Sequence, residues 1–229
     1  MNKLEKQDGF SVIIRSRNEE RWIGHSIQSV IENIPCNEIV LVDNKSHDNT
    51  LMNALRFQRD PNYNDLDSNY TEINLLNIDE YLPGKALNLG VKNSNYENII
   101  ILSSHCILKQ IDLKSILSNL ESYDGIFGNQ IPIYEGKKIK KRYLWNHFKD
   151  SQEENMFSDM EQRYFFHNAI SCFKKKTLEK NPFNESLSGK EDRYWARDII
   201  ESGGKTLYDP EIIVDHHYTP EGNTWKGIG

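Results

Sequence analysis

The sequence predicts an α/β fold in which a mostly parallel central sheet is flanked by helices. Apolar, β-branched runs at residues 10–15 and 38–43 are each followed by a polar turn and a segment with helical periodicity. The run at 99–102 has no polar interruption, as expected for a strand buried on both faces of a sheet. Strands and helices that alternate at short intervals imply right-handed βαβ units.

The remaining elements follow in chain order. The first half adds a helix over 22–31 that stops before Pro35, a helix after the turn 44–50 capped by Ser46 or Asp48, a polar loop at 62–69, a weak strand at 73–76 and a helix that opens at 84. The second half adds a mobile loop or helical insertion over 135–160, an ordered segment at 165–173, a helix over 191–202 stopped by Gly203 and Gly204, and short strands at 206–208 and 211–214.

Composition excludes several classes of protein. The 229 residues are 37% hydrophobic and 27% charged, as in a globular protein, and the net charge of -6 argues against a general nucleic-acid binder. No apolar run is long enough to span a bilayer, and residues 1–8 lack the apolar core of a signal peptide. Cys36, Cys106 and Cys172 form neither a disulfide framework nor a zinc pattern, which favours a cytoplasmic location.

Histidines stand at the ends of two predicted strands. Ser103, Ser104 and His105 follow the buried run at 99–102, at the sheet edge where open α/β folds bind ligands. His216 and His217 follow the apolar residues 212–214. A lone histidine is usually a satisfied core or surface residue, but histidines at two strand ends indicate a site for a divalent cation, Mn²⁺ or Mg²⁺.

Three other segments carry groups suited to catalysis or binding. Asp43, at the end of the second strand, is either a ligand for a base or ribose or an ordinary turn residue. Glu191 and Asp192 open a helix, where carboxylates are stabilised by the helix dipole, or they act as a general base with a partner. Lys85, followed by Asn88, is either a phosphate ligand at a helix start or a solvated lysine.

In their order, these segments resemble the family 2 glycosyltransferases of the GT-A fold. Residues 11–20 resemble the opening S-V-I-I-P-T-Y-N-E, with Arg15 and Arg17 in place of Pro and Tyr. Residues 42–50 resemble V-D-D-G-S-x-D-G-T, residues 84–90 resemble A-x-N-x-G, and 183–185 with 191–192 resemble F-D-E followed by E-D. The family's D-x-D falls on 103–105, which lacks both carboxylates and is closer to the D-x-H of polypeptide N-acetylgalactosaminyltransferases.

The resemblance implies roles for individual residues. Asp192 would be the catalytic base with Glu191 beside it, and His105 with His216 or His217 would hold the cation. The donor would be bound by Arg15, Arg17, Asn18, Glu19, Asp43, Lys85, Asn88, Ser103 and Ser104. Residues 1–229 would form one domain, with a nucleotide-binding half at about 8–106 and an acceptor-binding half at about 107–229. The loop at 135–160, with Tyr143 and Trp145, would cover the acceptor.

The implied reaction moves a sugar from a nucleotide-sugar, with UDP-sugars favoured, to a carbohydrate or lipid-linked glycan acceptor. The Glu191–Asp192 context implies that the transfer inverts the configuration of the sugar. The expected process is surface polysaccharide or glycoconjugate synthesis, in the cytoplasm or at the inner membrane face. Peripheral membrane association is left open. Two alternatives remain: a metal-free or catalytically silent sugar-nucleotide-binding protein, because the metal carboxylates are missing, and a sugar-phosphate nucleotidyltransferase, although residues 15–21 lack the glycines of its first loop.

Overall fold

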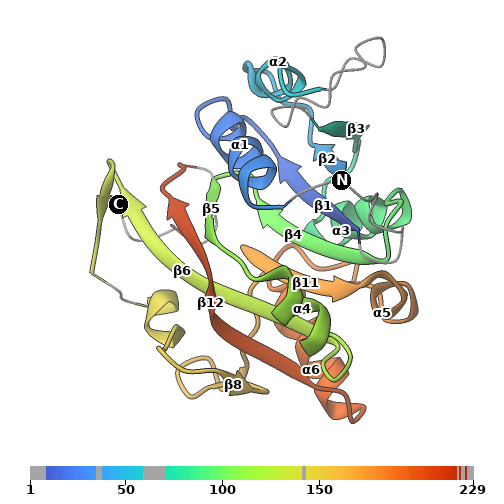
Figure 1. Ribbon diagram of the computed structural model, residues 1–229, viewed down its shortest axis with the longest axis vertical. Coiled ribbons are helices and arrows are strands. Elements are labelled where there is room, and N and C mark those ends of the chain that lie inside the picture. Colours follow the sequence, from blue (N-terminus) through green and yellow to red (C-terminus); the bar gives the residue numbers. More distant parts are fainter. Residues whose placement is uncertain are drawn as a thin grey trace.

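A ten-stranded mixed sheet runs through the molecule, with its strands in the order β3-β2-β1-β4-β11-β6-β12-β5 and with β7 and β8 paired outside this path (Figure 1). The computed structural model describes residues 9–34, 38–58, 71–140, 143–220, 222 and 225. The polar loop expected at 62–69 lies outside these residues, as does most of the tail at 220–227. The predicted α/β class and the mostly parallel sheet are confirmed.

The first half of the chain forms a parallel βα unit. Its strands are β1 (Phe10–Ser16), β2 (Glu38–Asp43), β3 (Glu72–Asn77) and β4 (Asn98–Ser103). Its helices are α1 (Ile23–Asn33), α2 (Thr50–Leu55) and α3 (Pro83–Lys92). The pairs β3–β2, β2–β1 and β1–β4 are parallel, so their carboxyl ends share one edge of the sheet.

Alternation along the strands gives the sheet two apolar cores. Val12 and Ile14 of β1 pack in the core that contains Ile23 and Ile27 of α1. Ile13, on the opposite face, packs in a second core with Leu87 of α3. Because both faces are covered, β1, β2 and β4 read as continuous apolar runs, and this is why they were predictable.

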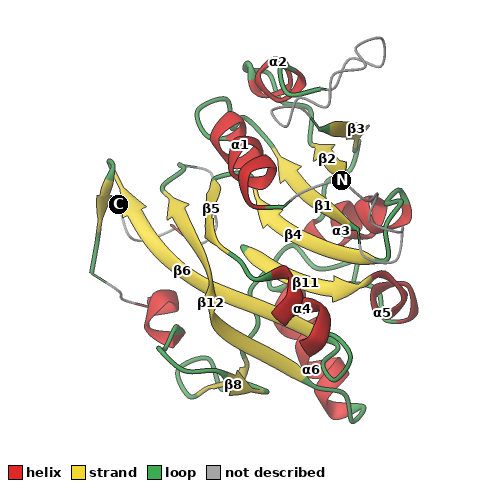
Figure 2. Cartoon of the chain, in the orientation of Figure 1, coloured by secondary structure: helices red, strands yellow, loops and turns green. Residues whose placement is uncertain are grey.

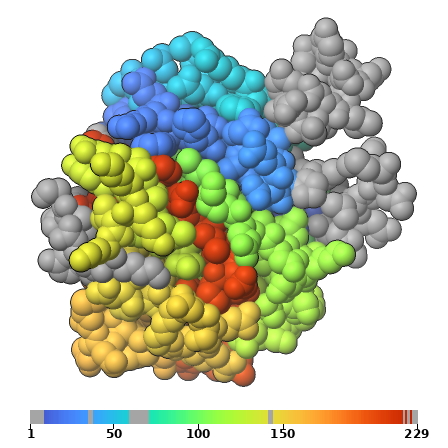
Figure 3. All heavy atoms as spheres, turned by 60° about the vertical axis from the view of Figure 1, so that its left-hand side comes forward, coloured from blue at the N-terminus to red at the C-terminus, as the bar shows by residue number. Residues whose placement is uncertain are grey.

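The second half extends the sheet with antiparallel and parallel pairs. Its strands are β5 (Cys106–Gln110), β6 (Gly125–Tyr134), β7 (Lys137–Lys138), β8 (Glu153–Glu154), β9 (Phe157–Ser158), β10 (Arg163–Tyr164), β11 (Ile170–Lys174) and β12 (Thr206–His217). Its helices are α4 (Leu113–Asn119), a 3-10 helix (Tyr143–His147), α5 (Lys175–Lys180) and α6 (Glu191–Glu201). Figure 2 shows α4 and α6 beside the long strands β6 and β12, and in Figure 3 β6, β12 and β5 form adjacent yellow, red and green bands.

In the second half one expectation was wrong and one strand was not predicted. The predicted strands 206–208 and 211–214 are a single strand, β12, whose pairing with β6 is irregular between Asp209 and Ile213. Pro210 lies in this irregular stretch, where its missing N–H costs no ladder hydrogen bond. The sequence also gave no separate indication of β5, which follows β4 after a two-residue turn.

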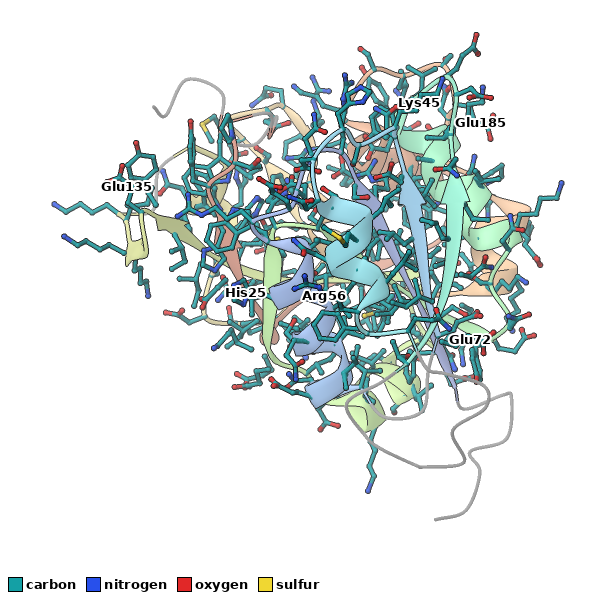
Figure 4. All side chains as sticks on the ribbon, turned by 90° about the horizontal axis from the view of Figure 1, so that it is seen from above. His25, Lys45, Arg56, Glu72, Glu135 and Glu185 are labelled. Atoms are coloured by element: carbon teal, nitrogen blue, oxygen red, sulfur yellow. The ribbon has the colours of Figure 1, made fainter. Side chains whose placement is uncertain are left out.

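The segment 135–160 is neither a plain loop nor a helical insertion. It contains the 3-10 helix and β7, which pairs with β6 in a hairpin whose tip carries Glu135 and extends from the body of the molecule (Figure 4). Trp145 is fully buried in the second core. It is therefore a packing residue, and its indole is not available to cover an acceptor.

The Asp48 carboxylate accepts the Thr50 N–H at the start of α2, although the helix itself begins after Asn49. Cys106 and Cys172 are buried free thiols, and Cys36 lies outside the described residues. In the described part of the chain, no helix combines the length and apolarity needed to cross a membrane.

Candidate active site

A cleft of about 880 Å³ opens at the carboxyl ends of the parallel strands. β1 supplies Arg15, which is in register with Ser103 at the end of β4. The amino end of α6 lines the cleft with Glu191 and Asp192. Of the residues predicted from the sequence, those that line the cleft are Arg15, Arg17, Glu19, Ser103, Ser104, His105, Glu191 and Asp192.

Asp43 lies beneath the cleft and does not line it. Its side chain is fully buried, and its oxygens accept hydrogen bonds from the hydroxyls of Ser16 and Ser46 and from the Ser46 N–H. Asn44, the next residue, lines the cleft. In this arrangement Asp43 shapes the turn after β2, and contact with a nucleotide base would require that turn to open.

Asn18 braces the two loops that follow β1 and β2. Its side-chain oxygen accepts the His47 N–H at 2.9 Å, and its own N–H donates to Ser46 Oγ at 3.0 Å. The backbone of Asn18 has a φ of 52°, in the left-handed region that asparagine tolerates better than most residues. Asn18 therefore holds the loop that carries Glu19, and it lies outside the cleft lining.

Lys85 and Asn88 also lie outside the cleft lining. Lys85 Nζ is 3.2 Å from Glu80 Oε2 near the start of α3. The Asn88 amide donates to the Phe183 carbonyl and to Glu185 Oε1, and it accepts the Phe183 N–H. Asn88 thus ties α3 to the segment before α6, a positioning function that the sequence pattern did not distinguish from donor binding.

A chain of polar side chains runs from the cleft into the protein: His105 lines the cleft, and His216, which is buried and outside the cleft lining, lies behind it. His105 Nδ1 is 2.9 Å from Glu19 Oε1, and His105 Nε2 is 3.2 Å from His216 Nε2. His216 Nδ1 is 2.8 Å from Gln130 Oε1. The antiparallel pairing of β12 with β5 sets His216 opposite Cys106, and so brings it beside the turn that carries His105.

His217 does not join this pair, contrary to the expectation that it could hold the cation. Successive side chains of a strand point to opposite faces, so His217 faces away from His216. Its ring stacks on Trp22, with the ring centroids 4.1 Å apart. Burial lowers the pKa of His217 to about 4.

The histidine pair fits two ligands of a divalent cation. The Nδ1 atoms of His105 and His216 are hydrogen-bonded to Glu19 and Gln130, and the two Nε2 atoms face each other. Metal-binding histidines are commonly oriented in this way, by a second residue that binds the other ring nitrogen. Two nitrogen ligands that each lie about 2.1 Å from one ion, with an angle of about 90° at the ion, are about 3.0 Å from each other. The two Nε2 atoms are 3.2 Å apart, which is close to this distance. The described residues contain no cluster of three or more His, Cys, Asp or Glu arranged for a metal, so a bound diphosphate would have to supply further oxygens.

Glu191 and Asp192 are adjacent but have different partners. Arg15 Nη1 donates to Glu191 Oε1 at 3.0 Å, and burial, opposed by Arg15, raises the pKa of Glu191. Burial acts most strongly, to raise the pKa of Asp192, but the Arg193 guanidinium, His167 and the hydrogen bond from the Asn168 N–H together hold that pKa below its usual value. Both oxygens of Asp192 lie 3.0 Å from Arg193 Nη1.

Several residues of the cleft were missed by sequence reasoning. Arg193 is held by Glu161, with 3.6 Å between Nη2 and Oε1, and stacks over the Phe165 ring at 4.7 Å. The Asn168 N–H donates to Asp192 at 3.1 Å, and the His167 ring lines the cleft. These residues do not belong to a recognisable sequence motif. They meet only because α6 packs against the segments that precede β10 and β11.

The neutral form of His167 predicts an acid-sensitive fold. Its Nδ1 accepts the Ala169 N–H, and burial lowers the pKa of its ring to about 3. Between about pH 3 and pH 6.5 the unfolded chain therefore binds up to one more proton at this residue than the folded chain. As pH falls below 6.5, this residue alone should lower the free energy of unfolding by about 1.4 kcal/mol per pH unit.

Urea unfolding of the metal-free protein between pH 7.5 and 5 measures this slope. The matched variant is His167→Asn, because the Asn oxygen can accept the Ala169 N–H and does not titrate. Its slope should be shallower than that of the original chain by the stated amount. Equal slopes for the two proteins would show that His167 is not held neutral by the fold.

The architecture at this cleft is matched by a known family. The family model for glycosyl transferase family 2 matches residues 11–181. The chain belongs to this family. The match confirms the family resemblance of the sequence motifs, while the likeness of residues 103–106 to a D-x-H motif stays a prediction. A comparison with curated proteins finds no match.

Solved structures share the fold of this family 2 chain. S. aureus TarS 1-349 in complex with UDP-GlcNAc has a TM-score of 0.69 and 16% identity over 95% of this chain and 61% of its own. GalNAc-T7 with UDP, GalNAc and Mn²⁺ has a TM-score of 0.65 and 18% identity over 93% of this chain and 44% of its own. The mannosyltransferase PcManGT from Pyrobaculum calidifontis, in complex with GDP-Man and Mn²⁺, has a TM-score of 0.63 and 18% identity over 93% of this chain and 58% of its own. The chain therefore spans less than two thirds of each structure, and these likenesses show the GT-A fold.

Proposed function

We propose that this protein transfers a sugar from a nucleotide-sugar donor to a hydroxyl of a carbohydrate acceptor. The observation that carries the proposal is the cleft that His105 shares with the carboxylates Glu191 and Asp192 at the amino end of α6, with the buried His216 in contact with His105. A leaving diphosphate needs positive charge, and an attacking hydroxyl needs a base. Family membership and neighbours in complex with UDP-GlcNAc and GDP-Man support the same reaction class.

The donor diphosphate would lie against the ends of β1 and β4. Arg15 and Arg17 supply positive charge there, and Ser103 and Ser104 supply hydroxyl donors on the facing strand end. Asn44 is the residue after β2 that could contact the base directly. A UDP-sugar remains the favoured donor, by analogy with the TarS and GalNAc-T7 complexes.

A divalent cation, Mn²⁺ or Mg²⁺, would be held by His105 and His216. When bound, the cation would supply Lewis-acid stabilisation of the charge that develops on the leaving diphosphate. Glu19 and Gln130 hold the two rings in the orientation that presents Nε2. The structures of GalNAc-T7 and PcManGT with Mn²⁺ support a cation in this protein.

The carboxylate pair would accept the proton of the acceptor hydroxyl as that oxygen attacks the anomeric carbon. A direct attack of this kind inverts the configuration of the sugar. The acceptor would enter on the side lined by Leu144, Met160 and Glu161. Surface polysaccharide or glycoconjugate synthesis, with a carbohydrate or lipid-linked glycan acceptor at the inner membrane face, remains the proposed context.

A panel of nucleotide-sugars tests the proposal. UDP-, GDP-, dTDP- and CMP-sugars are added with and without Mn²⁺, and thermal shift, calorimetry and release of free nucleotide are measured. One nucleotide class should bind with a Kd of about 1 mM or lower and be turned over with a suitable glycan acceptor. Binding without turnover across acceptors would favour the silent binder, and no binding of any donor would reject the proposal.

A further inference from the structure

Arg15 and Glu191 form an ion pair inside the cleft. They come from the end of β1 and the first turn of α6, and their charged atoms are 3.0 Å apart. The Arg15 side chain is 19% exposed and the Glu191 side chain 7%. Because Arg15 stands at the sheet edge opposite Ser103, a diphosphate bound there would compete with Glu191 for the guanidinium.

Asp192 has no comparable competitor. Its oxygens accept hydrogen bonds from the backbone N–H groups of Asn168 and Arg193 and from Arg193 Nη1. Arg193 is itself nearly buried, between the Phe165 ring and Glu161. Asp192 is therefore a fixed anion whose lone pairs are already engaged, which leaves Glu191 as the carboxylate whose side-chain partner can be exchanged.

We propose that Arg15 holds Glu191 until the donor diphosphate binds, and that the released Glu191 then accepts the proton of the acceptor hydroxyl. This inference rests on the proposed transferase function. The acceptor O–H bond breaks and its proton passes to a Glu191 oxygen while the acceptor oxygen bonds to the anomeric carbon. The bond from that carbon to the phosphate oxygen breaks, and its electron pair leaves with the nucleoside diphosphate.

The charges around the pair set the direction of the effect. The charged or titratable groups that share the cleft with Glu191 are Arg15, Arg17, Glu19, Tyr81, His105, Glu161, His167, Lys190, Asp192 and Arg193. Burial and the Asp192 charge raise the pKa of Glu191, and Arg15 lowers it. When the diphosphate takes Arg15, the lowering contribution weakens, so Glu191 becomes a stronger base exactly when the donor is in place.

Proton uptake on donor binding measures this exchange. Calorimetric titration with the nucleotide-sugar from the panel is repeated in buffers of different ionisation enthalpy between pH 5 and 7.5, with EDTA and separately with saturating Mn²⁺. Both phosphates of a nucleotide-sugar are esterified and do not titrate in this range. The protein should take up a net fraction of a proton, with roughly one as the upper limit, per donor bound.

Variants decide whether Glu191 is the group concerned. Glu191→Gln should bind the donor with this uptake lost, and Arg15→Gln should lose it as well because Glu191 is then released before binding. Glu201→Gln, the same change at the exposed far end of α6, should keep the uptake of the original protein. Donor binding without uptake, or uptake that persists in Glu191→Gln, would overturn this inference and leave the transferase proposal standing. No donor binding at all would reject the transferase proposal itself.

Discussion

Replacement of Glu191 with Gln is expected to lower kcat by about 10²- to 10⁴-fold, the usual contribution of a general base. The amide keeps the size of the side chain and a hydrogen-bond acceptor but cannot take up the proton of the acceptor hydroxyl. Donor affinity should not fall, because in this variant the diphosphate no longer competes with a carboxylate for Arg15. Steady-state kinetics with saturating donor, together with calorimetric Kd values, measure the two quantities separately.

The pH profile gives a second readout for Glu191. Activity requires the ionised base, so kcat/KM should fall as pH drops through the pKa of Glu191 in the free enzyme. Burial raises that pKa above its ordinary value, so the acid limb should lie above the range of an exposed glutamate. Glu201→Gln should keep the profile unchanged. A Glu191→Gln enzyme with the original kcat would show that this carboxylate is not the base.

Asp192→Asn should behave differently from Glu191→Gln. It would leave the buried Arg193 guanidinium without its anionic partner, and breaking a buried pair from one side costs about 3–5 kcal/mol. The thermal midpoint should therefore fall more in Asp192→Asn than in Glu191→Gln, whose partner Arg15 is the more exposed of the two arginines. A stable Asp192→Asn enzyme without transfer activity would return the base to Asp192, as the family resemblance implied.

Replacement of His105 with Ala is expected to lower the affinity for Mn²⁺ in the presence of donor by about 100-fold or more. Loss of a residue that merely orients a metal ligand costs about 10- to 100-fold in metal affinity, and loss of a ligand should cost at least the upper value. Transfer activity at low Mn²⁺ should fall in parallel. Titration of free Mn²⁺ by electron paramagnetic resonance measures the affinity directly.

His217→Ala is the matched control for the histidine pair. This residue is adjacent to His216 in sequence but stacks on Trp22, so its loss should leave Mn²⁺ affinity unchanged. His216→Ala should match His105→Ala, with its folding checked by circular dichroism because His216 is buried against Trp145. Equal Mn²⁺ affinities in His105→Ala and the original protein, or an equal loss in His217→Ala, would contradict a cation site at the pair.

The sequence predicted the parallel half of the fold well because its strands are buried on both faces. Val12, Val40 and Ile100 lie in unbroken apolar runs that polar turns terminate, so strand and edge could both be located. β5 was not predictable, since the half-exposed stretch from Cys106 to Gln110 becomes a strand only by pairing with β12. That pairing joins residues about a hundred positions apart and leaves no local pattern.

The candidate site was predictable where chemistry coincides with the end of an element. His105 and Glu191 stand at such ends, and both line the cleft. Asp43 and Lys85 also stand at the ends of elements but do not line the cleft. Asp43 accepts hydrogen bonds from Ser46, and Lys85 is ion-paired with Glu80. Side chains that meet only through packing of distant segments, such as Arg193 with Glu161, have no signature in a single sequence.

The irregular pairing of β12 decides which of two neighbouring histidines faces His105. From Asp209 to Ile213 the pairing advances four residues along β12 but one along β6, so three residues of β12 have no counterpart. An odd excess reverses the phase of side-chain alternation beyond it. If one residue were deleted from this stretch and the rest of β12 slipped by one position against β5 and β6, His217 would take the place opposite Cys106 that His216 holds, and His216 would turn to the opposite face. The identity of the inward-facing imidazole thus depends on the length of the irregular stretch at 210–212 as well as on the histidines themselves.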